Sequence, residues 1–201
     1  AGQRMEIAHG VTILATGAWS VRLGRKLGLN LPVRHVHGEA AVTDYVGPVL
    51  TNFLSSAIFF EAAHHADEAN NHQPKAVLAI APTVHGHLLL GEVATEVDYF
   101  SNGSSPAAPS AISRVALRFL PVLRQARLVR SWAAPVAFTT DDKPFVGPVA
   151  GLAGLLLAVA FKSTVVIAPV IGQAITQLVT TGRSDLDLSP FLLARVKEQQ
   201  P

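Results

Sequence analysis

Two short segments, one near each end of the chain, have the residue types and the setting to bind an anionic ligand. Residues 15–19 (Ala-Thr-Gly-Ala-Trp) follow the apolar run 11–15, and residues 160–164 (Ala-Phe-Lys-Ser-Thr) follow the apolar run 155–161. Each run has the length and composition of a buried parallel strand. In an α/β sheet, ligands bind where such strands end and helices begin, because helix N-termini favour negative charge.

Gly17 and Lys162 give these two segments their chemical character. Gly17 lets a ligand approach the backbone closely, and Lys162 adds a full positive charge beside a predicted helix start. If the two turns converge, they would suit a ligand with an anionic end and a large flat apolar part. The alternative is that both are ordinary strand-to-helix turns with Lys162 in solvent, and the residues alone favour it.

Histidine is the other residue type that invites a chemical role. Three close pairs occur along the chain: His35 and His37, His64 and His65, and His85 and His87. The first and last pairs would each share one face of a strand. No pair has the spacing of a known metal motif, so we expect no metal site.

Asp141 and Asp142 are adjacent carboxylates that could act as a functional pair. They lie, however, in a Thr-Thr-Asp-Asp-Lys-Pro sequence that is typical of a turn. We therefore interpret them as turn formers. Trp132 and Phe138 could wall an active site, and packing in the core is the alternative for both.

Composition narrows the classes of protein. The chain has 201 residues, 49% of them hydrophobic and 15% charged, with a net charge of +2 and no cysteine. This excludes a disordered chain, a thiolate metal site and a cysteine nucleophile, and the scattered basic residues argue against nucleic-acid binding.

Residues 144–161 carry no charge, but the Pro and Gly residues in 144–154 indicate turns. We therefore favour a buried strand at 155–161 over a membrane-inserted segment spanning 144–179.

The pattern of elements predicts a mixed α+β fold. Strands are expected at residues 11–15, 32–43, 75–82, 85–93, 128–138 and 155–161. Residues 50–60 are expected to be a strand or a buried loop. Helices are expected at residues 19–27 (capped by Ser20), 110–120 (ended by Pro121) and 163–181 (ended by Gly182). Residues 61–74 and 101–109 are predicted to be surface segments.

Several motifs in this order resemble those of the D-amino-acid-oxidase-type family of FAD-dependent flavoenzymes. That family includes glycine and sarcosine oxidases, D-amino-acid and hydroxyproline dehydrogenases, and opine oxidase β-subunits. The motifs are residues 11–20 (strand, then Ala-Thr-Gly-Ala-Trp-Ser), 31–39 (Leu-Pro-Val-Arg-His-Val-His-Gly-Glu), 85–92 (His-Gly-His-Leu-Leu-Leu-Gly-Glu), 139–148 (Thr-Thr-Asp-Asp-Lys-Pro-Phe-Val-Gly-Pro), 161–172 (Phe-Lys-Ser-Thr, then Ala-Pro and Gly) and 188–191 (Leu-Ser-Pro-Phe).

The resemblance implies FAD as cofactor and assigns residues to it. The cofactor-binding residues would be Thr16, Gly17, Ala18 and Trp19 from the first turn, and Phe161, Lys162, Ser163, Thr164 and Val165 from the second. The second group would lie at the pyrimidine edge of the flavin. A reduced flavin carries negative charge there, which a helix N-terminus and an ammonium group stabilise.

The same resemblance implies a domain plan with the dinucleotide-binding βαβ unit missing. Residues 1–31 and 139–191 would be the C-terminal part of an FAD-binding α/β domain, residues 32–138 an antiparallel-sheet substrate domain, and residues 192–201 a tail. No G-x-G-x-x-G sequence occurs, so the chain is expected to be a C-terminal portion of a longer enzyme or one half of a split one.

Two departures from the family pattern bear on substrate binding. Val136 occupies the position where many amine-oxidising relatives have a carboxylate-binding Arg, and His37 and Glu39 replace the Arg and Gln of an Arg-Gly-Gln motif. His37, Trp132 and Val136 are the expected substrate-side residues.

The function expected from the resemblance is oxidation of the C–N bond of an amino or imino acid by hydride transfer to FAD. The alternative is a non-catalytic interaction subunit, or a remnant, that does not bind FAD alone. Expected partners are the small substrate and an N-terminal half or other subunits, without nucleic acid and without a membrane span. We expect the protein in the cytoplasm, with peripheral membrane attachment as an alternative.

Overall fold

The computed structural model divides the chain into two compact units. Unit 1 comprises Ala1–Arg34 and Ala137–Pro201, and unit 2 comprises His35–Val136. Both boundaries fall inside long strands, β2 (Val33–Thr43) and β6 (Leu128–Thr139), so the chain passes between the units as extended strand. The residues that the structure describes are 5–57, 75–97, 101–161 and 164–196.

Unit 1 is built on a three-stranded sheet. Its strand order is β1 (Thr12–Leu14), β8 (Leu155–Val159), β7 (Phe145–Pro148), with β1 parallel and β7 antiparallel to β8. The central strand β8 is apolar throughout because it is covered on both faces. Leu157 belongs to the core on one face and Leu156 to the core on the other, as strand alternation requires.

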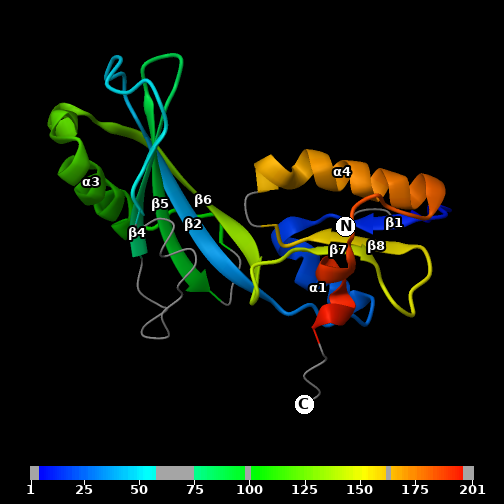
Figure 1. Cartoon of the computed structure of the whole chain (residues 1–201). Coiled ribbons are helices and arrows are strands. Elements are labelled where there is room, and N and C mark those ends of the chain that lie inside the picture. The colour runs from blue at the N-terminus through cyan, green and yellow to red at the C-terminus, as the bar shows by residue number, and fades with distance from the viewer. Residues whose placement is uncertain (1–4, 58–74, 98–100, 162–163, 197–201) are drawn as a thin grey trace. The chain divides into compact units, whose positions relative to one another are not determined.

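Helices cover the two faces of this sheet (Figure 1). The short helix η1 (Gly17–Trp19) continues into α1 (Ser20–Lys26) and packs on the face of Leu14 and Leu157, while α4 (Thr164–Thr181) packs on the face of Leu156. Two further turns of helix, η3 (Ser189–Phe191) and η4 (Leu193–Arg195), close the unit near its C-terminal end.

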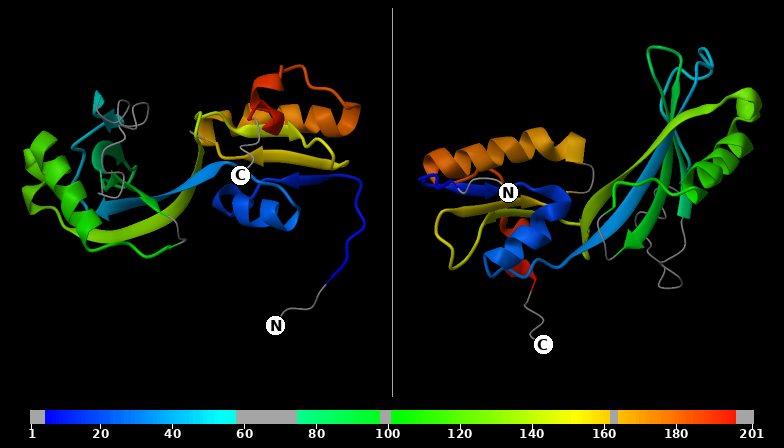
Figure 2. Two further views of the ribbon diagram at one scale, coloured as in Figure 1. Left: turned by 90° about the horizontal axis from the view of Figure 1, so that it is seen from below. Right: turned by 180° about the vertical axis from the view of Figure 1, so that it is seen from behind.

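Unit 2 is an antiparallel sheet with a helix on one face (Figure 2). The strand order is β3 (Leu54–Ser55), β4 (Lys75–Pro82), β5 (Leu88–Val97), β2, β6, and β5 runs antiparallel to both β4 and β2. Helix α3 (Ala107–Phe119) and the short η2 (Pro121–Gln125) cover one face. The buried residues between sheet and helices are Ala41, Leu78, Ile80, Leu88, Leu90, Val93, Ala108, Ile112, Ala116 and Leu123.

The mixed fold class and most of the expected elements are confirmed. Gly182 ends α4 as predicted, with a φ of +75° and its N–H donating to Leu178 O at 3.1 Å. The segment 50–60, expected to be a strand or a buried loop, contains within the described part the short strand β3. The predicted surface segment at 61–74 lies outside the described residues.

Four local expectations are wrong. Residues 101–109 were expected to form a surface segment, but α3 already begins at Ala107, and Ala108 is buried. Ser20 does not cap α1: it is buried and its hydroxyl pairs with Thr16 Oγ1 at 3.0 Å, because η1 already turns the chain before it. Residues 145–148, expected to lie in turns, form β7, where Pro148 is tolerated as the last residue of an edge strand. His85 and His87 lie in the tight turn between β4 and β5 instead of on one strand face.

Candidate cofactor and substrate site

Strands β1 and β8 bring the two candidate turns to one edge of the unit 1 sheet. The parallel register pairs Thr12 with Leu155 and Leu14 with Leu157. Because parallel strands end at the same edge, the turns that follow Leu14 and Val159 start side by side. The strands that lead into the two candidate turns are therefore neighbours, while Lys162 in the second turn lies outside the described residues.

The first turn presents open backbone. Gly17 has a φ of +51°, and a Cβ placed on it would meet nothing within 4 Å. Thr16 turns its hydroxyl inward to Ser20, and Thr16 O accepts the N–H of Trp19 at 3.0 Å, while Ala18 is buried in the core. Trp19 is 48% exposed. A ligand can therefore lie against the Gly17 backbone beside an exposed aromatic ring.

The second turn starts with a constrained residue. Ala160 is buried and has a φ of +60°, a conformation that costs a non-glycine residue energy and is found mainly where the surrounding structure fixes it. Phe161 is partly buried against the core below α4. Lys162 and Ser163, and the side chains of Thr164 and Val165, lie outside what the structure describes. The α4 helix begins at Thr164, so its free N–H groups start at this edge.

A concave surface lies beside the first turn. It has a volume of about 470 Å³ and is lined by Thr16, Trp19, Arg22, Leu23 and Lys26, all from the first turn and the helix that follows it. An apolar floor with two cationic side chains suits a group that is flat and anionic. The described residues around the first turn therefore fit an FAD-like cofactor.

Trp132 and Val136 lie on the face of the unit 2 sheet that α3 leaves open. A Cβ placed on Gly38 would lie 3.6 Å from Cγ2 of Val136, so these two positions share a face. Trp132 lies four residues earlier on β6 and, by strand alternation, points to the same side. Its side chain is 39% exposed. The structure thus places two of the three expected substrate-side residues on one face of the sheet.

His37 lies on the opposite face, under α3. It is 7% exposed, and its Nε2 lies 3.7 Å from Oε1 of Glu39. Glu39 in turn accepts the Ser104 hydroxyl at 2.8 Å, the Ser105 hydroxyl at 2.9 Å and the Ser105 backbone N–H at 2.6 Å. Within the described residues, Nδ1 of His37 is buried without a hydrogen-bond partner. The structure does not bring His37 to the face that carries Trp132 and Val136.

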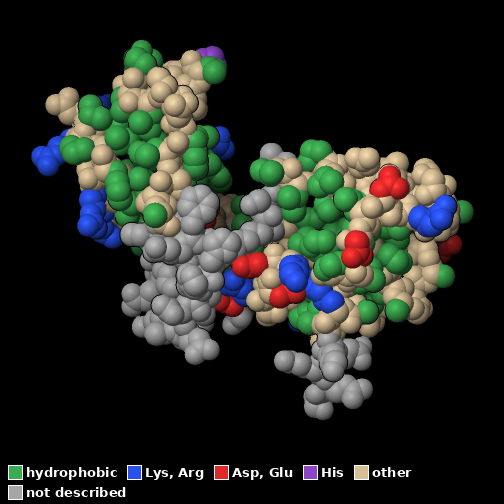
Figure 3. Space-filling model, viewed as in Figure 1, with side chains coloured by type: hydrophobic (Ala, Val, Ile, Leu, Met, Phe, Trp, Pro, Cys, Tyr) green, Lys and Arg blue, Asp and Glu red, His purple; other side chains and the backbone are tan. Residues whose placement is uncertain are grey.

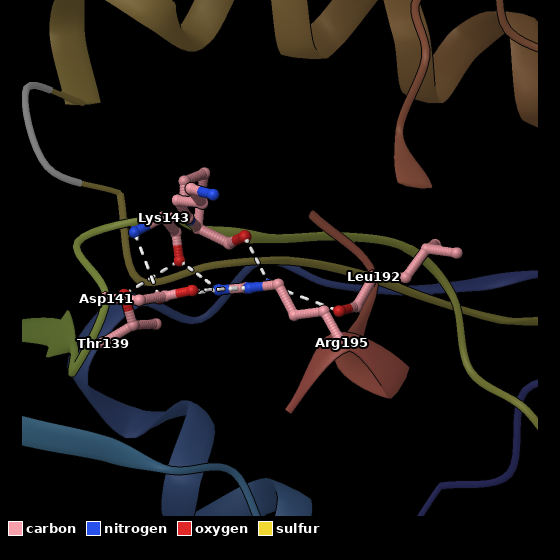
Figure 4. A network of polar contacts seen from close by, with 6 residues as sticks. Thr139, Asp141, Lys143, Leu192 and Arg195 are labelled. Carbon is pink, nitrogen blue, oxygen red and sulfur yellow. Dashed lines mark hydrogen bonds and ion pairs between the residues drawn. The ribbon is translucent and has the colours of Figure 1, made fainter. Parts of the chain in front are cut away.

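Sequence reasoning missed a second polar network, around Arg195 (Figure 4). The Arg195 guanidinium donates to both carboxylate oxygens of Asp141, at 2.8 and 3.0 Å, and to the backbone oxygens of Lys143, Pro144 and Leu192. These bonds hold the pKa of the Asp141 carboxyl well below its usual range. Asp141 also accepts the backbone N–H of Lys143, which confirms its interpretation as a turn former.

The described residues hold neither a cluster of metal ligands nor a helix suited to a bilayer. No group of three or more His, Asp or Glu side chains in that part of the chain could hold a metal ion. None of the helices there combines the length and the apolar character that crossing a bilayer requires.

Comparison with known proteins places this chain in a family. Residues 2–178 match the family model described as FAD dependent oxidoreductase. The chain is 30% identical to glycine oxidase of Pseudomonas putida over 92% of its own length and 46% of the relative, and 27% identical to an opine oxidase subunit from Agrobacterium tumefaciens over 99% and 47%. It spans about half the length of the curated relatives it matches.

A solved structure agrees with these matches. The crystal structure of glycine oxidase from Geobacillus kaustophilus superposes with a TM-score of 0.78 at 26% identity, over 93% of this chain and 46% of that one. The same enzyme is 27% identical over 184 residues in the sequence comparison. The two parallel strands that end in candidate flavin turns thus belong to a recognised fold, and the chain is a member of the DAO family of FAD-dependent oxidoreductases.

Proposed function

We propose that this chain is the flavin-contacting and substrate-covering portion of an enzyme that oxidises the C–N bond of an amino or imino acid. The parallel pairing of β1 with β8, which starts both candidate turns at one sheet edge, carries this proposal. When bound, FAD supplies the chemistry by accepting a hydride from the substrate carbon. In this assignment residues 1–31 and 139–191 form the FAD-binding portion and residues 32–138 the substrate-binding sheet.

The chain's own residues would hold and polarise the cofactor. The open backbone at Gly17, flanked by Thr16, Ala18 and Trp19, would admit a flat group that a side chain at position 17 would exclude. At the second turn, residues 161–165 would contribute the start of α4 and the Lys162 charge. Both favour negative charge on the flavin, which makes hydride acceptance easier.

The open face of the unit 2 sheet would cover the substrate. Trp132 and Val136 supply apolar surface there, and Val136 cannot form the bidentate carboxylate contact that an Arg would form. His37 would support the sheet from its other side through Glu39. The relatives named as a glycine oxidase and as part of an opine oxidase support a substrate of the amino-acid class.

A second candidate is an interaction subunit that binds no flavin by itself. Two observations favour this second function. The chain spans about half of its relatives' length, and one relative is named as a subunit of its enzyme. The two candidates differ in one measurable property, which is flavin bound to the assembled protein.

A pair of glycine variants tests the flavin assignment. Gly17 and Gly28 both have positive φ, +51° and +73°, and a Cβ on either would meet nothing within 4 Å, so Gly17→Ala and Gly28→Ala carry similar backbone strain. Only Gly17 lies at the proposed site. The chain would be co-expressed with the part of Geobacillus glycine oxidase that it does not match, and bound flavin would be measured by visible absorbance.

We expect flavin in the assembled protein, retention by Gly28→Ala, and at least about tenfold weaker flavin binding by Gly17→Ala, which corresponds to about 1.4 kcal/mol. An assembled protein without flavin would favour the interaction subunit. Equal losses in both variants would show that backbone strain, and not contact with the cofactor, explains the effect.

A further inference from the structure

The central strand of the unit 2 sheet, β5, carries one extra residue, Glu92. Opposite it on β2, Glu39 pairs with Val93 and Ala40 pairs with Gly91, so Glu92 has no residue directly across from it. This arrangement is a β-bulge, which changes the direction of a side chain. Val93 packs in the core under α3, so by strand alternation Glu92 points to the face that α3 leaves open.

Trp132 lies on the same open face, on the far side of β2 from β5. Just beyond the end of β2, the Asp44 N–H donates to Arg127 O at 2.8 Å, and the Arg127 N–H donates to the Asp44 carboxylate at 3.0 Å. Farther back along β2, a Cβ on Gly38 would lie 3.6 Å from Cγ2 of Val136. β2 and β6 therefore run antiparallel, and Trp132 lies beside the part of β2 between these two contacts.

Only small side chains separate Trp132 from Glu92 on this part of the sheet. Ala40 lies between them, because it belongs to that part of β2 and is also the neighbour of the bulge on β5. Gly38, which shares the face of Ala40, pairs with Ala94. Neighbouring strands lie about 4.8 Å apart, so about 10 Å separates the backbones of β5 and β6. A guanidinium or ammonium group can lie over Ala40 and contact both the Glu92 carboxylate and the Trp132 ring.

The Glu92 carboxylate has no charge partner within the described residues. Glu92 is partly buried, burial raises the pKa of its carboxyl, and no hydrogen bond or cation of that part of the chain counteracts the rise. Arg130 is on the same face, two residues from Trp132, but forms no ion pair with Glu92. Figure 3 shows Lys and Arg side chains beside α3, where Arg114 and Arg118 are exposed on the other side of the sheet. A partly buried carboxylate without a partner costs free energy, and a bound cation would remove that cost.

We propose that Glu92 and Trp132 determine substrate specificity by binding a cationic group that the substrate carries in addition to its reacting amine. The inference rests on the proposed function, in which the open face of the unit 2 sheet covers the substrate. The substrate class is then an amino or imino acid with a guanidinium or ammonium group in its side chain. The alternative is that the Glu92 carboxylate only reaches water and contacts no ligand.

Arginine and citrulline are the probes, each as both enantiomers, because their side chains match in length and shape and differ in charge. Affinity would be measured by calorimetric titration of the chain co-expressed with the part of Geobacillus glycine oxidase that it does not match. All the proposed contacts lie in unit 2, so the full chain alone would be titrated as well. Anaerobic bleaching of bound flavin would report oxidation separately.

Glu92→Gln and Glu96→Gln form a matched pair of variants. Glu92→Gln keeps the size of the side chain and removes an unpaired, partly buried charge, so it should fold at least as stably as the unchanged chain. Glu96 is on the same strand and, by alternation, on the same face, but it has an interaction of its own. Glu96→Gln therefore removes one negative charge from this face without removing the proposed contact.

We expect arginine to bind at least about tenfold more tightly than citrulline, the effect of one charge-assisted hydrogen bond. Glu92→Gln should reduce this preference to about twofold or less, and Glu96→Gln should retain most of it. Equal affinities for the two probes in the unchanged protein would overturn the proposal, as would a preference that survives Glu92→Gln or falls equally in Glu96→Gln. Selective binding of arginine without flavin bleaching would uphold the cation contact and refute the proposed function. Flavin bleaching by citrulline as readily as by arginine would do the reverse.

Discussion

Replacing Arg195 with leucine should destabilise unit 1 more than an ordinary surface substitution does. The Arg195 side chain is 12% exposed and forms a two-pronged ion pair with Asp141, whose side chain is 41% exposed. Its guanidinium also lies 4.1 Å from the centre of the Phe145 ring and donates to three backbone oxygens. Arg195 thus ties the turn before β7 to the C-terminal segment, 54 residues away.

The expected loss in free energy of unfolding is the sum of three contributions that Arg195 makes. An ion pair with a partly exposed carboxylate contributes about 1 kcal/mol after solvent screening. The partly buried stacking on Phe145 contributes about 1 kcal/mol. The bonds to backbone oxygens, which water can replace in part, add about 1 kcal/mol together. Arg195→Leu should therefore cost about 3 kcal/mol, or about 6–12 °C in melting temperature for a chain of this size. Arg195→Lys keeps the charge but loses the two-pronged geometry, so its melting temperature should fall between those of the unchanged chain and Arg195→Leu.

Thermal unfolding of the full chain as a function of pH measures separately how much the Arg195–Asp141 ion pair contributes to stability. The pKa of Asp141 is held low in the folded state, so its contribution is present above the pKa of an unfolded Asp, about 3.9, and is lost as the pH falls through the folded value. The gap in melting temperature between the unchanged chain and Arg195→Leu should narrow in acid. A gap that stays constant from neutral pH into acid would refute the ion pair as a source of stability.

Three further substitutions test other parts of the structure by chemical denaturation. Glu39→Gln should cost about 1–3 kcal/mol, because a neutral amide cannot accept all the hydrogen bonds that the buried carboxylate accepts. Gly86→Ala should destabilise the chain more than Gly28→Ala, because its Cβ would lie 2.5 Å from the Tyr45 ring. Glu92→Gln should stabilise the chain at neutral pH by up to about 1 kcal/mol, because burial raises the Glu92 pKa; the gain should vanish below the unfolded pKa, where both states are protonated.

The parts of the fold that could be predicted from the sequence are those with a local physical signal. The apolar runs that became β1 and β8 are strands because each is buried by packing, and their β-branched and leucine-rich composition shows it. Gly28 and Gly182 mark helix ends because only glycine adopts positive φ without cost. The pairing of these two strands, on which the convergence of the candidate turns depends, has no such local signal.

The parts that could not be predicted depend on partners far along the chain. The Arg195–Asp141 pair joins residues 54 apart, and the Ser105–Glu39 bonds join residues 66 apart. An arginine or a glutamate has the same local sequence pattern whether it ends in solvent or in such a network. β7 was missed for a related reason, since Gly147 and Pro148 suggest a turn until pairing with Leu157 and Leu156 places them in a strand.

The motif His37-Gly38-Glu39 shows why a resemblance alone does not place a side chain. Alternation along β2 sends His37 and Glu39 to the α3 side and leaves Gly38 on the open face, against Val136. The Glu39 carboxylate then receives the Ser105 N–H, one residue before the N-cap of α3, where a negative charge is favourable. The Glu39 carboxylate therefore links the start of a helix to the sheet. What the motif offers to a ligand on the other face is the absence of a side chain at Gly38.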